Sequence, residues 1–449
     1  MKYVLDNNVK TYTKNNKVIF LNPNKGTFVK MRLKNKEILG DILQGNYNDK
    51  SCSEYIEKII NSLKSSYIIN EYTESNKSYN EIYEPLNSVY FIVTEKCNLN
   101  CKFCCTNSGP LKNNQSDLSV SEISSTIDKI SNLKPHRIII TGGEPFIRKD
   151  ILDIVDMLSD GIGCKIIVQS NGLLLTNEII DKLYKKVYQI DISLENIFEN
   201  KNEKDTLIPI LDYLKFKGIK IVFSFVAMPE NLKYIKQFID LCVLYEAEFT
   251  IKTVQLVGRA NENKNLVLSK LQTVNMYYEV YKYICQEEYY KYSNVYSYVF
   301  PEIMPKITCS ACGNAISITS NGDIYPCHSL RYPEFYLGNI LNMNHIEIRD
   351  KLLQNKHSKF YNSCFNIDER KSCKECEFKY LCGGICFANA YKNKENKFPT
   401  ECNTLKIARE FYMWEYDKKD TAKNNMERLI KRFNEKLNNE TDIIFEDIN

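Results

Sequence analysis

Residues 89–104 read VYFIVTEKCNLNCKFC, so a run of apolar and β-branched residues leads directly into three closely spaced cysteines. The apolar part predicts a buried β-strand over Val89–Thr94. The loop that follows has cysteines at positions 97, 101 and 104, which is a C-x3-C-x2-C spacing. Three thiolates can hold three irons of a [4Fe–4S] cluster and leave the fourth iron open to another ligand. The alternative is a zinc site, in which Cys105 or a remote histidine would complete the four ligands.

From Val89 to about Gln286, strand-like and helix-like patterns alternate. Such alternation predicts parallel strands joined by crossover helices. The strand-like runs are Val89–Thr94, Arg137–Thr141, Lys165–Gln169, Gln189–Ser193, Lys220–Ala227 and Glu248–Leu256. The helix-like runs include Val120–Leu133, Lys149–Leu158, Asn177–Lys185, Leu207–Lys217 and Leu232–Tyr245. Six units rather than eight predict an α/β fold, a partial (β/α)6 TIM barrel, with functional groups on the loops after its strands.

A second motif, Thr141-Gly142-Gly143-Glu144-Pro145, stands at the end of the second predicted strand. Glycines let the backbone approach a bound ammonium group closely, and Glu144 can supply negative charge. Alone, Gly-Gly-Glu-Pro would be an ordinary turn. In register after the cysteine loop, it closely resembles the radical S-adenosylmethionine (SAM) superfamily, over residues 89 to about 260.

This resemblance implies that Cys97, Cys101 and Cys104 bind a cluster whose open iron chelates the amino and carboxylate groups of SAM. It also implies that one electron from this cluster cleaves SAM to methionine and a 5′-deoxyadenosyl radical, which abstracts a hydrogen atom from the substrate. The resemblance also implies the cofactor-binding residues. Those at the SAM amino group are Gly142, Gly143 and Glu144, and those near the ribose are Ser170 and Asn171. Ser193 is implied as a further contact to the cofactor.

The sequence departs from related enzymes after the fourth predicted strand. Relatives often continue Ser-Leu-Asp-Gly and then supply an arginine that pairs with the SAM carboxylate. This chain reads Ser193-Leu194-Glu195-Asn196, with Lys201 and Lys204 but no arginine nearby. The residue that pairs with the SAM carboxylate is therefore left open.

Eight further cysteines follow in two groups of C-x2-C pairs and single cysteines. Alone, the pair at 373 and 376 would favour zinc. Downstream of the first two motifs, the spacings resemble the SPASM domain, which houses two auxiliary [4Fe–4S] clusters, and this implies three [4Fe–4S] clusters in all. The ligands that the resemblance implies for the first auxiliary cluster are Cys309, Cys312, Cys327 and Cys386. Those for the second are Cys373, Cys376, Cys382 and Cys402.

Auxiliary clusters suit a reaction that removes two electrons from the substrate, because a substrate radical that bonds to a nucleophile leaves one electron to be accepted. His328 directly follows Cys327, at the position where related sulfatase-maturing enzymes have a proton-accepting aspartate. His328 is therefore a candidate catalytic base, with second-shell hydrogen bonding to the cluster as its alternative role.

Composition restricts the classes of partner and the cellular location that the chain can have. The formal net charge is +4, with no concentrated basic region, which argues against a nucleic-acid or membrane partner. No run approaches the about 18 apolar residues of a membrane span, and no signal pattern opens the chain, so we expect a cytoplasmic protein. The 17 cysteines are then metal or cluster ligands by default rather than a disulfide framework.

Residues 1–85 predict a small winged-helix module. Val18–Leu21 and Thr27–Met31 flank the turn-rich Asn22–Gly26 as a hairpin, and helices are predicted over Lys36–Leu43 and Ser53–Leu63. This order resembles the PqqD-like precursor-recognition element, which implies binding of a leader peptide at a sheet edge. We expect both hairpin strands to offer that edge. A polar linker is predicted over Glu71–Asn80.

The predicted domains are 1–85 for peptide recognition, 86–300 for the radical SAM core, 301–425 for the SPASM domain and 426–449 for a helical tail. The resemblances imply a maturase that cross-links a cysteine of a ribosomally made precursor peptide as a thioether, with a flavodoxin or ferredoxin as electron donor. A formylglycine-forming sulfatase maturase and a carbon–carbon cross-linking enzyme are the alternatives. A winged-helix redox regulator is disfavoured, since residues 1–85 hold thirteen Lys or Arg against ten Asp or Glu, too mild a bias for a DNA-binding face.

Overall fold

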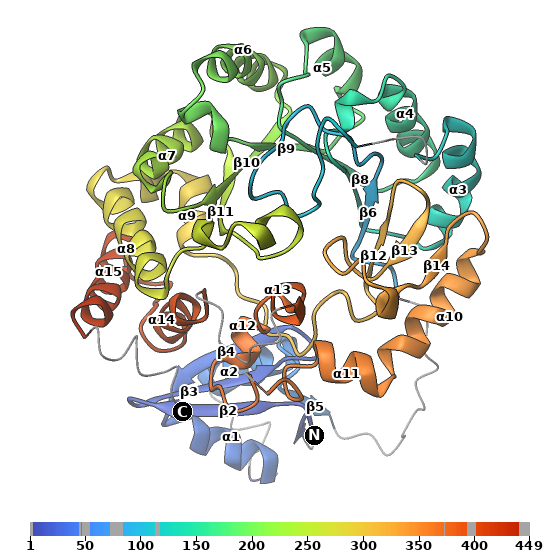
Figure 1. Cartoon of the computed structure of the whole chain (residues 1–449). Helices are drawn as coiled ribbons and strands as arrows, with labels where there is room; N and C mark the ends of the chain where they lie inside the picture. The colour runs from blue at the N-terminus through green and yellow to red at the C-terminus, as the bar shows by residue number, and fades with distance from the viewer. Residues whose placement is uncertain are drawn as a thin grey trace.

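The structure is a computed structural model that describes residues 3–44, 46, 54–71, 84–112, 117–371, 373–392 and 401–439. Most of the predicted linker, residues 72–80, lies outside the described residues. Figure 1 shows strands at the centre of the molecule, helices around one side of them, and the N-terminal sheet on the other side.

A partial barrel of parallel strands forms the centre. Its six strands follow one another in space in the order of the sequence, and each pairs in parallel with the next. They are β6 (Ser88–Ile92), β7 (Arg137–Thr141), β8 (Lys165–Ser170), β9 (Gln189–Ser193), β10 (Lys220–Ala227) and β11 (Glu248–Thr253). The predicted α/β fold and its six parallel strands are confirmed.

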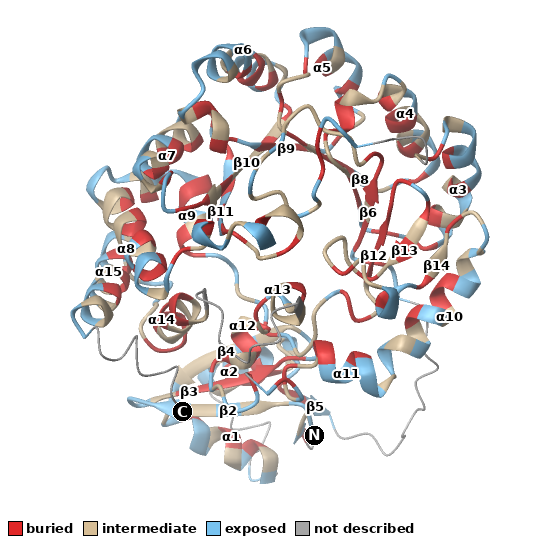
Figure 2. Ribbon diagram, viewed as in Figure 1, coloured by how far each residue is buried: buried red, intermediate tan, exposed pale blue. Residues whose placement is uncertain are grey.

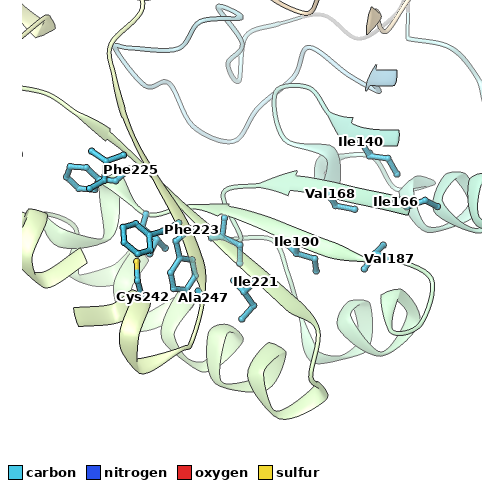
Figure 3. Packing of buried hydrophobic residues seen from close by; sticks show 14 of the residues in the cluster. Ile140, Ile166, Val168, Val187, Ile190, Ile221, Phe223, Phe225, Cys242 and Ala247 are labelled. Atoms are coloured by element: carbon cyan, nitrogen blue, oxygen red, sulfur yellow. The ribbon is translucent and has the colours of Figure 1, made fainter. Parts of the chain in front are cut away.

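Helices cover the outer face of this sheet. They are α3 (Val120–Asn132), α4 (Ile151–Gly161), α5 (Asn177–Leu183), α6 (Lys201–Lys217), α7 (Ile235–Leu244), α8 (Lys270–Gln286) and α9 (Ser293–Val299). Alternate strand residues such as Ile190, Phe223 and Phe225 point towards these helices and are fully buried, and Figure 3 shows part of this packing. In Figure 2 the strands and the inner faces of the helices are buried, whereas the outer helix faces are exposed. The other strand residues face the inside of the barrel.

The cysteine-rich region extends the barrel sheet, which the sequence did not predict. Strand β12 (Ala315–Ile318) pairs in parallel with β6, and β13 (Asp323–Tyr325) and β14 (Gly338–Asn339) continue the sheet antiparallel. All four residues of β12 are buried. Because β12 runs parallel to β6, this pairing places Cys309 and Cys312, which precede β12, near the first residues of β6.

The N-terminal module, which we define as residues 3–71, is a small sheet with two helices. Strands β2 (Lys10–Lys14), β3 (Lys17–Asn22) and β4 (Thr27–Arg32) form an antiparallel sheet, and β1 (Tyr3–Leu5) pairs with β5 (Ile69–Glu71). Helices α1 (Asn35–Gln44) and α2 (Glu54–Ser65) follow. The predicted hairpin is confirmed, but the expectation that both its strands offer a free edge is wrong. Strand β3 is paired on both sides, because β2, which the sequence analysis missed, occupies one of them.

The two faces of β3 have different neighbours. Val18 and Phe20 face the module's own core with α1 and α2. Ile19 and Leu21 face the opposite way and pack against Cys373, Tyr380 and other residues of the C-terminal region. The N-terminal module is therefore docked on the cysteine-rich region, as Figure 1 shows.

The C-terminal region contains short helices around the cysteines and two longer ones. They are α10 (His345–Lys356), α11 (Lys359–Phe365), α12 (Lys379–Cys382), α13 (Phe387–Lys392), α14 (Glu401–Trp414) and α15 (Ala422–Asn438). In α15, Met426, Leu429 and Phe433 are buried in the main core. Phe433 meets Tyr281 of α8 edge to face. The tail helix packs on the barrel, as its apolar spacing predicted. Among the described residues, no helix combines the length and apolar character needed to cross a membrane.

Candidate functional site

A cavity of about 530 Å³ lies inside the barrel at the carboxyl ends of its strands. Its size is that of an ordinary cofactor or small-molecule site. The cavity brings together most of the residues that the sequence predicted for SAM and the first cluster: Cys97, Cys101, Cys104, Gly142, Gly143, Ser170, Asn171 and Ser193. His328, from the cysteine-rich region, also lines it. Parallel strands gather their carboxyl-end loops at one edge, which explains why residues so distant in sequence meet.

The three cysteines of the first loop have hydrogen-bond donors aimed at their sulfur atoms. The backbone N–H groups of Leu99 and Ser108 lie 3.4 Å from the Sγ atoms of Cys97 and Cys104, respectively. The Asn196 side-chain amide lies 3.9 Å from Cys101 Sγ. Burial raises the pKa of Cys101 to about 11, while this Asn196 contact lowers it. Donors that point at sulfur stabilise thiolates and tune a bound cluster, so this donor set fits a cluster with three protein ligands.

Arg259 holds the cysteine loop in place. Its Nε donates to the Cys101 carbonyl oxygen at 2.8 Å, and Nη2 donates to the Ser108 carbonyl oxygen at 2.6 Å. The backbone N–H of Arg259 donates to the Cys104 carbonyl oxygen at 2.9 Å. The Gly258-Arg259-Ala260 segment had no clear role in the sequence. In the structure it clamps the loop backbone and leaves the thiols free to bind metal.

Gly142 and Gly143 pack against the backbone that leads into the cysteine loop. A Cβ atom at Gly142 would lie 2.3 Å from the Thr94 carbonyl oxygen, and one at Gly143 would lie 2.2 Å from that of Lys96. Any side chain at either position would push these two loops apart. Glycine at both positions keeps the cysteine loop and the cavity wall in contact.

Glu144 is fully buried, and its carboxylate is saturated by donors from the protein. Oε1 accepts from Ser170 Oγ at 2.9 Å and from the Phe146 N–H at 3.1 Å, and Oε2 accepts from the Asn171 N–H at 2.8 Å. Burial raises the pKa of Glu144, and these three donors oppose that shift. Glu144 thus fixes Ser170 and Asn171 at the cavity wall. Asn171 in turn donates from its side chain to Asn98 of the cysteine loop at 2.9 Å.

The fourth strand ends in Ser193, which is exposed in the cavity, and Glu195, which is buried. The Val226 N–H donates to Glu195 Oε1 at 2.7 Å. Burial raises the pKa of Glu195 to about 7, while hydrogen bonds to backbone N–H groups, including that of Val226, and the charge of Lys252 lower it. Glu195 therefore lies close to half-ionised near neutral pH.

His328 lies at the opposite wall of the cavity, next to Cys327. Its ring centroid is 4.5 Å from that of Tyr90 on β6. Burial, together with the positive charges of Lys252 and Arg331, lowers the pKa of His328 to about 4. The imidazole is therefore neutral at physiological pH. Arg331 pairs with Glu95, which connects this wall to the segment before the cysteine loop.

The downstream cysteines gather into the two groups that the spacing predicted. Cys373, Cys376, Cys382 and Cys402 surround one small cavity. In the other group, burial raises the pKa of Cys327 to about 12, and negative charge on Cys386 and Cys309 adds to this shift. Cys312 packs in the same apolar cluster as Cys309 and Cys327. Four clustered thiols under an apolar shell fit a four-iron cluster.

Within the described ranges, no three His, Cys, Asp or Glu side chains converge on a position for one metal ion. Cys364 packs beside Cys312 in the first group, and Cys105 lines the central cavity beside Cys104.

Sequence reasoning missed several residues that line the cavity, among them Tyr90, Asp191 and Lys252. The signal was available, because residues inside a barrel alternate with buried ones along each strand. On β11, Phe249, Ile251 and Thr253 are buried, whereas Glu248, Thr250 and Lys252 are exposed.

Two family models match the chain. The radical SAM superfamily model matches residues 91–242, and the SPASM model, described as an iron-sulfur cluster-binding domain, matches residues 309–377. The first match covers the cysteine loop and the wall with Gly142 and Gly143. The second covers five of the eight predicted downstream ligands, which are Cys309, Cys312, Cys327, Cys373 and Cys376. It also covers Cys364, which is not one of the predicted ligands.

Curated relatives align with about two thirds of this chain and are about a quarter identical to it over that part. Mycofactocin maturase of Mycolicibacterium smegmatis is 23% identical over 314 residues, which is 66% of this chain and 76% of the relative. The AdoMet-dependent heme synthase of Methanosarcina barkeri is 25% identical over 336 residues, 67% of this chain and 90% of the relative.

Solved structures are similar in fold. Streptococcus suis SuiB bound to S-adenosylmethionine has a TM-score of 0.52 and 16% identity, covering 86% of this chain and 96% of SuiB. The protein anSMEcpe with bound AdoMet has a TM-score of 0.58 and 14% identity, covering 78% of this chain and 100% of that protein. These likenesses show that the whole arrangement of barrel and cysteine-rich region is shared.

Proposed function

The chain is a radical SAM enzyme with a SPASM domain, and from that premise we propose that it modifies a ribosomally made precursor peptide by joining a cysteine thiol to a carbon atom as a thioether. The observation that carries this proposal is the docking of the N-terminal module. The module packs through Ile19 and Leu21 on the cysteine-rich region, and His328 of that same region lines the central cavity. A peptide held by the module is thus tethered to the part of the protein that forms one wall of the cavity.

Tethering raises the effective concentration of the segment to be modified, so the cavity itself needs little recognition of sequence. We assign residues 1–85 to peptide recognition, 86–300 to the radical SAM core, 301–425 to the two auxiliary sites and 426–449 to a helical tail. Within the described residues, the edge strands of the module's three-stranded sheet are β2 and β4. A leader peptide would add to one of them as a further strand. SuiB has been solved bound to its precursor peptide SuiA, which supports a peptide substrate for this fold.

Thioether formation replaces one C–H bond and one S–H bond by one C–S bond. One hydrogen atom, one proton and one electron leave the peptide. When bound, SAM with its cluster supplies the acceptor for the hydrogen atom, and an auxiliary cluster supplies the acceptor for the electron. We propose three four-iron clusters in all, with a flavodoxin or ferredoxin as the external electron donor.

The chain's own residues position the reactants and take the proton. Gly142, Gly143, Ser170 and Asn171 form the wall that would hold SAM, beside the three thiols that would hold the cluster. His328 presents a neutral imidazole to the cavity, and we assign it the thiol proton. The walls would shield the reacting atoms from water on the sides that they cover, which limits the loss of a reactive intermediate.

The test first searches the genes next to this one for a short cysteine-rich open reading frame. The encoded peptide is then incubated anaerobically with reconstituted enzyme, SAM and reductant. We expect the peptide mass to fall by two hydrogens for each bond formed. For each bond, one cysteine should no longer react with an alkylating reagent. A mass loss with all thiols still alkylated would indicate a carbon–carbon bond instead. Replacement of a cysteine sulfur by a carbonyl oxygen would indicate formylglycine formation, and an unchanged peptide would contradict a peptide substrate.

A further inference from the structure

The central cavity has few positive charges with which to bind an anion. Among the described residues that line it, only Lys252 and Arg259 carry a permanent positive charge. The Arg259 guanidinium is committed to the cysteine loop through the Cys101 and Ser108 carbonyl oxygens and through Asn107 Oδ1 at 3.2 Å. Lys201 and Lys204, the cations nearest to the fourth strand in sequence, are exposed on α6 and do not line the cavity.

Lys252 projects into the barrel from β11. It lies in register with Val226 of β10, whose N–H donates to Glu195. Its positive charge acts on three groups around the cavity, since it lowers the pKa values of Glu195, His328 and Cys105. By its register Lys252 lies beside the part of β10 that contacts Glu195, in a cavity that Cys105 and His328 also line.

The acidic side chains that line the cavity accept hydrogen bonds from the protein, and Glu203 Oε1 accepts from the Asn200 side chain at 2.9 Å. The Asp191 carboxylate accepts from the Gln169 and Gln189 side chains at 3.1 and 2.5 Å. The Glu195 carboxylate accepts from a backbone N–H, and within the described part of the chain no ion pair involving Lys252 is formed. The exposed ammonium group of Lys252 therefore keeps its charge available to an anionic ligand that enters the cavity, with which it can form a charge-assisted hydrogen bond.

We propose that Lys252 binds a carboxylate in the central cavity, either the carboxylate of SAM or one from the peptide substrate. If the carboxylate belongs to the peptide, this inference rests on the proposed function. If it belongs to SAM, the inference needs only the radical SAM core. A lysine here supplies a single point charge rather than the bidentate pairing of an arginine. It would fill the position left open by the absence of an arginine after Ser193.

The test compares reconstituted wild-type enzyme with Lys252→Met and Lys252→Arg. Lys220→Met is the matched control, since Lys220 lies at the opposite end of the neighbouring strand and pairs with Glu248 at 2.7 Å. SAM affinity is measured without peptide, by equilibrium dialysis with labelled SAM. Affinity for the peptide encoded beside this gene is measured separately, by fluorescence anisotropy in the presence of SAM. Iron content is determined for every variant as the check on folding.

We expect Lys252→Met to weaken one of the two ligands at least about tenfold, the loss that follows from one charge-assisted hydrogen bond. We expect Lys252→Arg to recover part of that loss and Lys220→Met to change neither affinity. Weaker SAM binding would identify the SAM carboxylate, and weaker peptide binding alone would identify a peptide carboxylate. Unchanged affinity for both would overturn the proposal, as would an equal loss in Lys252→Arg with full iron content. If the wild-type enzyme leaves the peptide unbound and unmodified, the proposed function fails, and the SAM measurement still decides the role of Lys252.

Discussion

Glycine at position 143 is required by the space around it, because a Cβ atom there would lie 2.2 Å from the Lys96 carbonyl oxygen. The Gly143→Ala variant should therefore displace the cysteine loop and weaken SAM binding at least about tenfold, in line with the cost of overpacking a tight contact. Gly163→Ala is the control, since a Cβ atom at Gly163 would meet nothing within 4 Å. Equilibrium dialysis with labelled SAM gives both affinities. Equal SAM affinity in the two variants would contradict the account of this contact.

Glu195 should make stability depend on pH. Its pKa is about 7 in the folded protein against the ordinary value of 4.5, chiefly because of burial. Between these values the folded state holds more protons than the unfolded state, so the free energy of unfolding falls as pH rises through this range. The fall amounts to about 3 kcal/mol for a shift of this size.

The Glu195→Gln variant should lack that fall, because the amide cannot ionise but can still accept from the Val226 N–H. The thermal midpoint Tm of each protein, measured from about pH 5 to about pH 8, reports the difference. Relative to the variant, the wild-type protein should lose Tm as pH rises. Parallel Tm curves would show that Glu195 does not remain protonated in the folded protein.

At the scale of elements, the sequence predicted the strands and helices that have clear periodicity. The six barrel strands and the two loops that carry Cys97–Cys104 and Gly142–Gly143 belong to this group. Strand β12 was not predicted, because it has only four residues, all buried, and so shows no alternation. Strand β2 was missed because its residues Lys10–Lys14 are largely polar and exposed, since it is an edge strand.

Side-chain placement was less predictable than the elements. The motifs indicated which cysteines lie together, in that Cys97, Cys101 and Cys104 line one cavity and Cys373, Cys376, Cys382 and Cys402 line another. They could not indicate that Glu144 is buried away from the cavity, or that Lys252 faces into it. Both outcomes depend on how neighbouring strands pack, which no local pattern records.

Because β3 packs on the second group of downstream cysteines, disruption of this contact should weaken the cluster that they would hold. Ile19 is fully buried in the apolar cluster that contains Cys373. An unpaired carboxylate at this position, in Ile19→Asp, would cost several kcal/mol and separate the two surfaces. Iron content should then fall from about twelve to about eight per chain, with loss of one four-iron cluster.

Thr13→Asp is the control for that variant, because Thr13 is an exposed residue of the same sheet. SAM cleavage should persist in Ile19→Asp, since the first cluster is held by another part of the chain. Full iron content in Ile19→Asp would mean that the module does not support the second group of cysteines. The same docking means that deletion of residues 1–85 would expose Phe378, Leu381 and Trp414, so point variants test peptide recognition more cleanly than truncation.

For the whole molecule, the proposed reaction places the site that generates the radical apart from the site that accepts the electron. The first is built on the barrel by the loop Cys97–Cys104, and the second on the C-terminal region around Cys373 and Cys376. In the apolar clusters of the described residues, the N-terminal module packs against Cys373 and Cys376 and not against the Cys97–Cys104 loop. The central claim is that the two sites do separate parts of one oxidation.

The most direct test is a paired assay of 5′-deoxyadenosine release and peptide mass in the Cys373→Ala/Cys376→Ala double variant, with Cys164→Ala as a control outside both groups. The account predicts that the double variant still cleaves SAM but yields no cross-linked peptide, whereas Cys164→Ala does both. Full cross-linking by the double variant would contradict the claim that this cysteine group serves as the electron acceptor.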